Sequence, residues 1–72
     1  MKVPHELTGK RVRINQDVEF ASGETIKTGS KGTIKYAEIA LTLAFMVKID
    51  GAKGGIFPGA RCFTRNQFEV IE

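Results

Sequence analysis

A chain of 72 residues that is 42% hydrophobic and 26% charged has the composition of one small globular domain, and its length limits it to a small core. Its single cysteine, Cys62, excludes an internal disulfide, and a chain with one cysteine and one histidine cannot supply a structural zinc site of four nitrogen or sulfur ligands. The formal net charge of +3 suits a polyanionic partner without requiring one. We therefore expect no metal and no cofactor, and a reducing compartment, the cytoplasm.

We expect residues 1–8 to form an N-terminal extension and residues 9–72 to form the folded domain. The extension lacks the apolar centre of a secretory signal, and the most hydrophobic run, residues 39–47, is less than half a membrane span. We therefore expect a soluble, unexported protein without a membrane partner. His5, the only imidazole, is expected to be a surface residue in a loose segment.

Residues 9–15, "GKRVRIN", alternate apolar and polar side chains as a half-buried strand does. Val12 and Ile14 are expected inside, and the basic side chains between them in solvent. Residues 17–27 repeat the alternation and then present a Ser-Gly turn signal. This stretch predicts a polar hairpin or a long, partly extended loop.

Residues 28–36 contain two glycines, Gly29 and Gly32, that predict a tight turn leading into a strand. The next segment has a large apolar residue at every odd position. These residues are Ile39, Leu41, Leu43, Phe45, Val47 and Ile49. The pattern predicts one extended segment over residues 39–49 with these side chains in the core. A bulge is expected near Ala37-Glu38, because Tyr36 and Ile39 have opposite parity.

A helix over residues 37–46 is the alternative. Five residues of this stretch also have helical spacing: Ala37, Ala40, Leu41, Ala44 and Phe45. We prefer the strand because no Ser, Thr, Asp or Asn stands where an N-cap is needed. In addition, Asp50-Gly51 is a strong hairpin-turn signal at the far end of the segment.

Residues 53–62, "KGGIFPGARC", predict a tight corner first and a contact loop second. We expect a short strand around Ile56-Phe57. It should leave the sheet at Pro58-Gly59, because proline cannot donate a hydrogen bond to a neighbouring strand and glycine permits unusual backbone angles. Cys62 is expected to be a buried packing group, and the alternative is a thiol whose pKa is lowered by Arg61.

The end of the chain predicts a short turn followed by a closing strand. Phe63 returns to the interior, and residues 64–67, "TRNQ", suit a short 3-10 turn. Residues 68–72, "FEVIE", alternate as a strand with Phe68 and Val70 inward.

Five short strands separated by turns predict an all-β fold, specifically a small five-stranded barrel with a short 3-10 turn before the last strand. Four segments resemble the SH3-like barrels: "GKRVRI", "GSKGTI", "FMVKID" and "NQFEVIE". They are similar to that family's G-x-x-V-x-I strand, its G-x-x-G-T-I turn and strand, its V-x-I/F strand and its final E-V-I strand. The resemblance covers about residues 9–72.

Several relatives share this layout, and each resemblance implies a different task. The photosystem I peripheral SH3-like subunit and the variable chain of ferredoxin–thioredoxin reductase look similar and imply a noncatalytic accessory subunit. KOW-type modules imply contact with RNA or protein. Plasmid-borne trimethoprim-resistant dihydrofolate reductases share the G-x-R-V-R start and an I-Y-P segment similar to residues 56–58. They carry Val-Gln where this chain has Gly54-Gly55, so we do not expect an enzyme, and a small reductase of this kind is the third and most distant alternative.

The even-numbered residues of the segment 39–49 are also mostly apolar and would form an outer strip that a small barrel cannot cover. This strip and the corner loop are the predicted protein contacts: Ala40, Thr42, Ala44, Met46, Ile56, Phe57 and Pro58. Coverage of the strip by residues 3–7 is the alternative. The predicted function is noncatalytic binding of a protein, either a larger partner or a second copy.

Binding of RNA or DNA is the second prediction. It uses a basic face made of Lys10, Arg11, Arg13, Lys35 and Lys48. It ranks lower because Tyr36 is the only plausible aromatic platform for stacking a base. The carboxylates of Asp17, Glu19 and Glu24 are interpreted as solvated hairpin charges rather than metal ligands.

Overall fold

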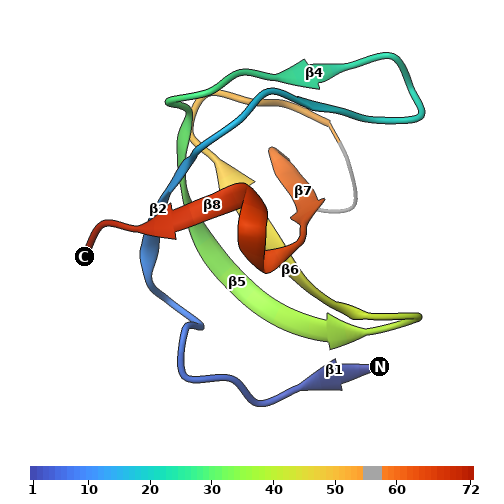
Figure 1. The fold of residues 1–72 in the computed structure, drawn as a ribbon, viewed down its shortest axis with the longest axis vertical. Helices are drawn as coiled ribbons and strands as arrows, with labels where there is room; N and C mark the ends of the chain where they lie inside the picture. The colour runs from blue at the N-terminus through green and yellow to red at the C-terminus, as the bar shows by residue number, and fades with distance from the viewer. Residues whose placement is uncertain (55–57) are drawn as a thin grey trace.

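The computed structural model describes residues 1–54 and 58–72, and it is an all-β fold (Figure 1). The described residues form eight strands and one short 3-10 helix, η1, before the last strand. Their bounds are β1 Lys2–Val3, β2 Arg11–Ile14, β3 Val18–Glu19, β4 Thr25–Ile26, β5 Lys31–Ile39, β6 Leu43–Ile49, β7 Ala60–Phe63, η1 Arg65–Gln67 and β8 Phe68–Val70. The predicted all-β class and the predicted 3-10 turn are confirmed.

Strand β5 holds the fold together. The main sheet runs in the order β7-β6-β5-β2-β8, with β1 also paired to β5, and β3 with β4 forms a separate two-stranded hairpin. Figure 1 shows β5 curving across the molecule, with β6 beside it over its length and β2 and β1 on its other edge. The sheet ends, β7 and β8, do not pair among the described residues, so the predicted closure into a five-stranded barrel is not observed.

The core contains side chains from nearly every strand. Val12 and Ile14 are fully buried, as their alternation predicted, and Phe63 and Phe68 are buried as well. The complete core cluster is Val12, Ile14, Val18, Ile26, Ile34, Ala37, Phe45, Val47, Ile49, Phe63 and Phe68. The rings of Phe45 and Phe68 meet edge to face at 5.3 Å between centroids, a favourable aromatic geometry.

Residues 37–46 contain no helix, so the helix alternative is wrong, but residues 39–49 do not form one strand either. β5 ends at Ile39 and β6 begins at Leu43, and the chain reverses over residues 40–42. An eleven-residue strand would span about 36 Å at 3.3 Å per residue. The molecule is only 28 Å along its longest axis. The reversal instead lets β6 return along β5 and complete an antiparallel ladder.

This reversal divides the predicted core residues into two groups. Phe45, Val47 and Ile49 are buried, as predicted. Ile39, Leu41 and Leu43 were also predicted to be buried, and that prediction is wrong, because they lie at or beside the hairpin turn with exposed fractions of 46%, 101% and 38%.

The predicted bulge lies earlier than expected. The β5–β6 register shifts between Ile34 and Tyr36, so Lys35 is the additional residue rather than Ala37 or Glu38. The extra residue restores the parity of the strand, because both Ile34 and Ala37 then face the core.

The two glycines of residues 29–32 have different roles. Gly29 has φ of 92° in the predicted turn, where the Ser30 N–H donates to the Lys27 carbonyl at 3.1 Å. Gly32 is not a turn residue. It lies in β5 opposite both Val12 and Ile49, and a Cβ atom there would lie 2.5 Å from the Lys48 carbonyl oxygen.

The N-terminal residues are not loose, contrary to expectation. β1 pairs with β5 through Lys2↔Glu38 and Val3↔Ala37. His5 is half-buried, with its ring edge to face on Phe45 at 4.9 Å and its Nδ1 accepting from the Leu7 N–H. Because Val3 and Leu7 pack against the core, this segment covers the inside of the sheet rather than the predicted outer strip.

We expect Gly32→Ala to destabilise the fold by about 3 kcal/mol, the upper part of the usual range for overpacking. The added methyl group would meet the Lys48 carbonyl oxygen at 2.5 Å and Cγ1 of the fully buried Val47 at 2.8 Å, and neither is the movable end of a flexible side chain. Gly23→Ala is the control, because Gly23 has φ of 92° with no atom within 4 Å of the added methyl group. Its cost should be limited to the left-handed backbone, about 1 kcal/mol. Chemical unfolding of both variants measures the difference, and an equal loss would contradict the tight packing at Gly32.

Candidate functional site

The β5–β6 hairpin ends in exposed large apolar side chains, which we call the apolar tip: Met1, Ile39, Leu41 and Leu43. Leu41 is 101% exposed and Met1 is 82% exposed. Met1 belongs to the tip because its backbone exchanges hydrogen bonds with Ile39 in both directions, at 2.9 and 3.1 Å. Figure 1 shows the hairpin extending past β7 and β8, with the N-terminus beside it.

The apolar tip continues the inner face of the sheet past the end of the core. The last covered row crosses the sheet in register through Val3, Ala37, Phe45 and Phe63. The next inward positions on β5 and β6 are Ile39 and Leu43, which pair with each other beyond the last residue of β7. No described strand lies over this row, so its side chains remain in water.

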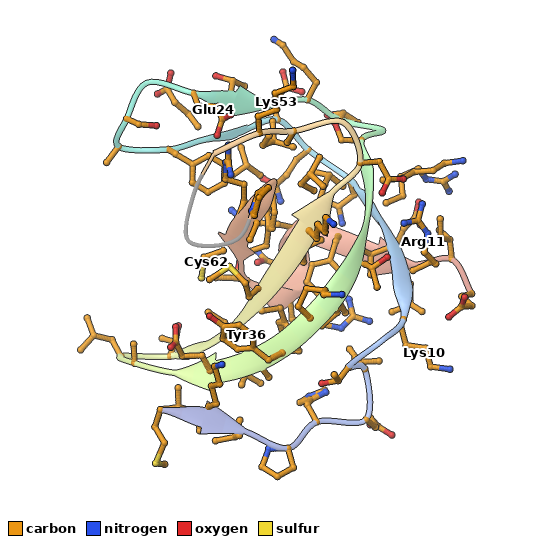
Figure 2. All side chains as sticks on the ribbon, turned by 180° about the vertical axis from the view of Figure 1, so that it is seen from behind. Lys10, Arg11, Glu24, Tyr36, Lys53 and Cys62 are labelled. Atoms are coloured by element: carbon orange, nitrogen blue, oxygen red, sulfur yellow. The ribbon has the colours of Figure 1, made fainter. Side chains whose placement is uncertain are left out.

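The outer face of the hairpin holds part of the predicted contact strip. Met46 pairs with Tyr36 on one side and with Cys62 on the other, and all three are at least partly exposed. Ala44 is the next outward residue toward the turn and is half-buried. The Lys2 Nζ lies 4.2 Å from the centroid of the Tyr36 ring, and Figure 2 shows Tyr36 and Cys62 on the same side of the sheet.

The other predicted contact residues are not part of one continuous strip. Ala40 and Thr42 are exposed in the hairpin turn, where the Ala40 N–H donates to the Thr42 carbonyl at 3.2 Å. Pro58 is exposed in the turn before β7. Ile56 and Phe57 lie outside the described residues.

Cys62 is exposed, so the prediction that it is a buried packing group is wrong. Its neighbour in β7, Phe63, points into the core, and alternation places Cys62 on the opposite face. Partial desolvation, with a smaller contribution from the Glu38 carboxylate, raises the pKa of the thiol. The alternative of a thiol activated by Arg61 is therefore wrong as well, because a raised pKa reduces the thiolate fraction.

The predicted basic face is partly neutralised by carboxylates. Arg11 makes a bidentate contact with Asp50, at 3.0 and 2.6 Å. Arg13 donates to Glu69 at 2.7 Å. The Arg11 guanidinium holds the pKa of Asp50 below its usual range. Three more predicted members of this face, Lys10, Lys35 and Lys48, are exposed.

The three carboxylates of the 17–27 segment do not converge on one point. Asp17 accepts hydrogen bonds from the Thr28 N–H at 2.8 Å and the Thr28 hydroxyl at 2.9 Å, which lower the pKa of Asp17. Glu24 instead contacts Arg61. No group of three or more potential metal-ligating side chains occurs within residues 1–54 and 58–72.

Arg61 connects three parts of the chain through one side chain that is only 14% exposed. Its guanidinium contacts both carboxylate oxygens of Glu24 in the β3–β4 hairpin. It also donates to the carbonyls of Lys53 at 2.6 Å, Gly54 at 3.1 Å and Ala60 at 2.8 Å. Figure 2 shows Glu24 and Lys53 at the same end of the molecule. Arg61 thus binds described residues on both sides of 55–57, and Gly54 and Gly59 both have positive φ.

Across the described ranges, no helix has the length and apolar character needed to cross a membrane. Comparison with protein-family models, with curated proteins and with solved structures found no match to this chain. The geometry of the described residues is therefore the basis on which a function can be proposed.

We expect the Arg61–Glu24 contact to make stability acid-sensitive. The guanidinium lowers the pKa of Glu24 below its ordinary value of 4.5, so its stabilisation is complete above that pH and is lost as the pH falls further. Glu24→Gln should therefore be less stable than the parent at pH 7, with the difference shrinking toward pH 3. Thermal unfolding at both pH values measures this. Glu19→Gln, on the same hairpin, is the control, and a difference that stays constant with pH would exclude the ionic contribution.

Proposed function

We propose that this chain is a noncatalytic protein-binding module of SH3-like topology whose apolar tip is buried by a partner protein. The strand order β7-β6-β5-β2-β8 and the 3-10 helix before β8 support the SH3-like assignment. A fold of this kind does not by itself identify a task, so the functional part of the proposal rests on the surface.

The observation that carries the proposal is the exposure of Leu41 among other large aliphatic side chains. Isolated apolar residues on a surface are ordinary, but four gathered at one end mark an interaction surface. Burying one such side chain completely is favourable by about 1.5–3 kcal/mol. The tip lies beyond the last covered row of the core, so a partner can cover it without rearranging the core.

Nucleic-acid binding is the second candidate, and the exposed lysines on the basic face are the observation in its favour. It ranks lower because Arg11 and Arg13 already donate to Asp50 and Glu69. A nucleic-acid phosphate would have to displace those carboxylates. The two ion pairs therefore offset part of the attraction between the arginines and the phosphate.

We expect Leu41→Asp to abolish capture of the partner without changing the fold. Leu41 is fully exposed, so its replacement should leave the thermal midpoint unchanged, while a carboxylate at the centre of an apolar contact should weaken binding at least about tenfold. Crosslinking pulldowns from the native host, read by mass spectrometry, compare the parent with this variant. Ile71→Asp is the matched control, because Ile71 is 39% exposed and lies outside the tip. Equal capture by Leu41→Asp would remove the tip from the proposal.

We expect short single-stranded RNA and DNA to bind no tighter than about 100 μM at physiological salt, the weak end of nonspecific binding. Fluorescence anisotropy at several salt concentrations measures this. Micromolar affinity that falls steeply with salt and is lost in Arg11→Ala and Arg13→Ala would reverse the ranking of the two functions.

A further inference from the structure

Building on the proposed protein-binding function, we propose that the partner that buries the apolar tip is a second copy of this chain, packed tip to tip about a two-fold axis. Four features of the described residues support a copy of the same chain: a free backbone edge, an uncharged hairpin sequence, a rim that carries charges of both signs and a patch of suitable size.

The first feature is the free edge of β6 beside the tip. The Ile49 N–H donates to the Gly59 carbonyl at 2.9 Å, so odd-numbered residues of β6 direct their backbone groups toward β7. The β6–β7 pairing ends at Phe45↔Phe63, after which the chain turns into η1. The backbone groups of Leu43 therefore have no strand partner among the described residues. Two such edges related by a two-fold axis can pair antiparallel, with Leu43 opposite Leu43.

The second feature is the lack of any residue that opposes such pairing. Exposed strand edges are normally protected by lysine, proline or a bulge. Residues 39–47, "IALTLAFMV", contain no charged residue, no glycine and no proline. The edge strand β1, in contrast, carries Lys2 and is followed by Pro4. The hairpin is thus the one described edge of the β1–β5–β6 region that is left open to another strand.

The third feature is the charge around the tip. Lys2 and Glu38 are register partners beside it, and the α-ammonium of Met1, which donates to the Ile39 carbonyl, adds a second positive charge. A two-fold copy presents the Glu38 carboxylate to these positive groups, whereas a strongly basic partner would be repelled by them. Figure 2 shows Lys10 and Arg11 on the side of the molecule away from the hairpin turn. The net charge of +3 therefore opposes tip-to-tip association only weakly.

The fourth feature is the size of the patch. Four large side chains, one of them fully exposed, present on the order of 500 Å², the size of the largest apolar patch on a typical monomer, which is often functional. Two copies would bury roughly 1,000 Å², the lower limit of a specific interface. The expected dimer is weak and reversible, with a Kd of about 10 μM to 1 mM.

Sedimentation equilibrium on the purified chain tests this from about 10 μM to 1 mM, the range of the expected Kd. The apparent mass should rise with concentration from 7.9 kDa toward twice that value. Leu41→Asp should remain monomeric throughout with an unchanged thermal midpoint, and Ile71→Asp should associate as the parent does. A parent that stays monomeric at the highest concentration, or a dimer that persists in Leu41→Asp, overturns the inference.

Crosslinking tests the tip-to-tip geometry separately. In a Cys62→Ser background, Thr42→Cys places a thiol in the hairpin turn, where two copies would meet, and Ser22→Cys places one in the β3–β4 hairpin as the control. Mild oxidation should yield disulfide-linked dimer from Thr42→Cys in large excess over Ser22→Cys, and equal yields contradict the geometry. The parent could be monomeric in sedimentation and yet capture a host protein that Leu41→Asp does not capture. In that case the protein-binding proposal stands, and only the choice of a second copy as the partner fails.

Discussion

The antiparallel ladder between β5 and β6 is the constraint on which the rest of the structure depends. It extends from Gly32↔Ile49 at one end to Ile39↔Leu43 at the other, and β5 also offers its opposite edge to β2 and β1. The other strands of the main sheet are added to this pair: β7 pairs with β6, β1 and β2 pair with β5, and β8 pairs with β2. The bulge at Lys35 and the glycine at position 32 let the pair bend tightly enough to enclose a small core. The same ladder, continued past the core, produces the apolar tip.

A second, local constraint holds the opposite end of the molecule. The β3–β4 hairpin belongs to neither edge of the main sheet, and it is joined to β7 through Glu24 and Arg61. Because the same guanidinium also binds the carbonyls of Lys53 and Gly54, one side chain joins the β3–β4 hairpin, residues 53–54 and β7. An arginine suits this position better than a lysine, since its planar group can satisfy a carboxylate and several carbonyls together. The two ends of the molecule thus differ, one held by ionic contacts and one apolar.

Much of the fold could be predicted from local patterns. Val12 and Ile14 alternate cleanly, the Ser-Gly and Asp-Gly pairs mark real turns, and the last strand follows its 3-10 turn as expected. The reversal at residues 40–42 could not be read from turn chemistry, because Ala-Leu-Thr contains none of the usual turn residues. The length of the chain did indicate that residues 39–49 could not form one strand. A compact chain of this size has a radius of gyration of about 11 Å, too small for an eleven-residue strand. The exposed tip was not predicted for the same reason. Leu41 and Leu43 continue the apolar alternation of the segment in sequence, so they were expected in the core, but the reversal places them outside it.

The position of the N-terminus has a practical consequence for how this protein is handled. Met1 is bonded to Ile39 beside the hairpin turn, whereas the C-terminus emerges on the other side of the molecule (Figure 1). An affinity tag or carrier protein fused ahead of Met1 would therefore emerge directly beside the apolar surface and compete with anything that docks there. A fusion after Glu72 keeps that surface clear, so the choice of terminus decides whether the apolar tip stays accessible in a recombinant preparation.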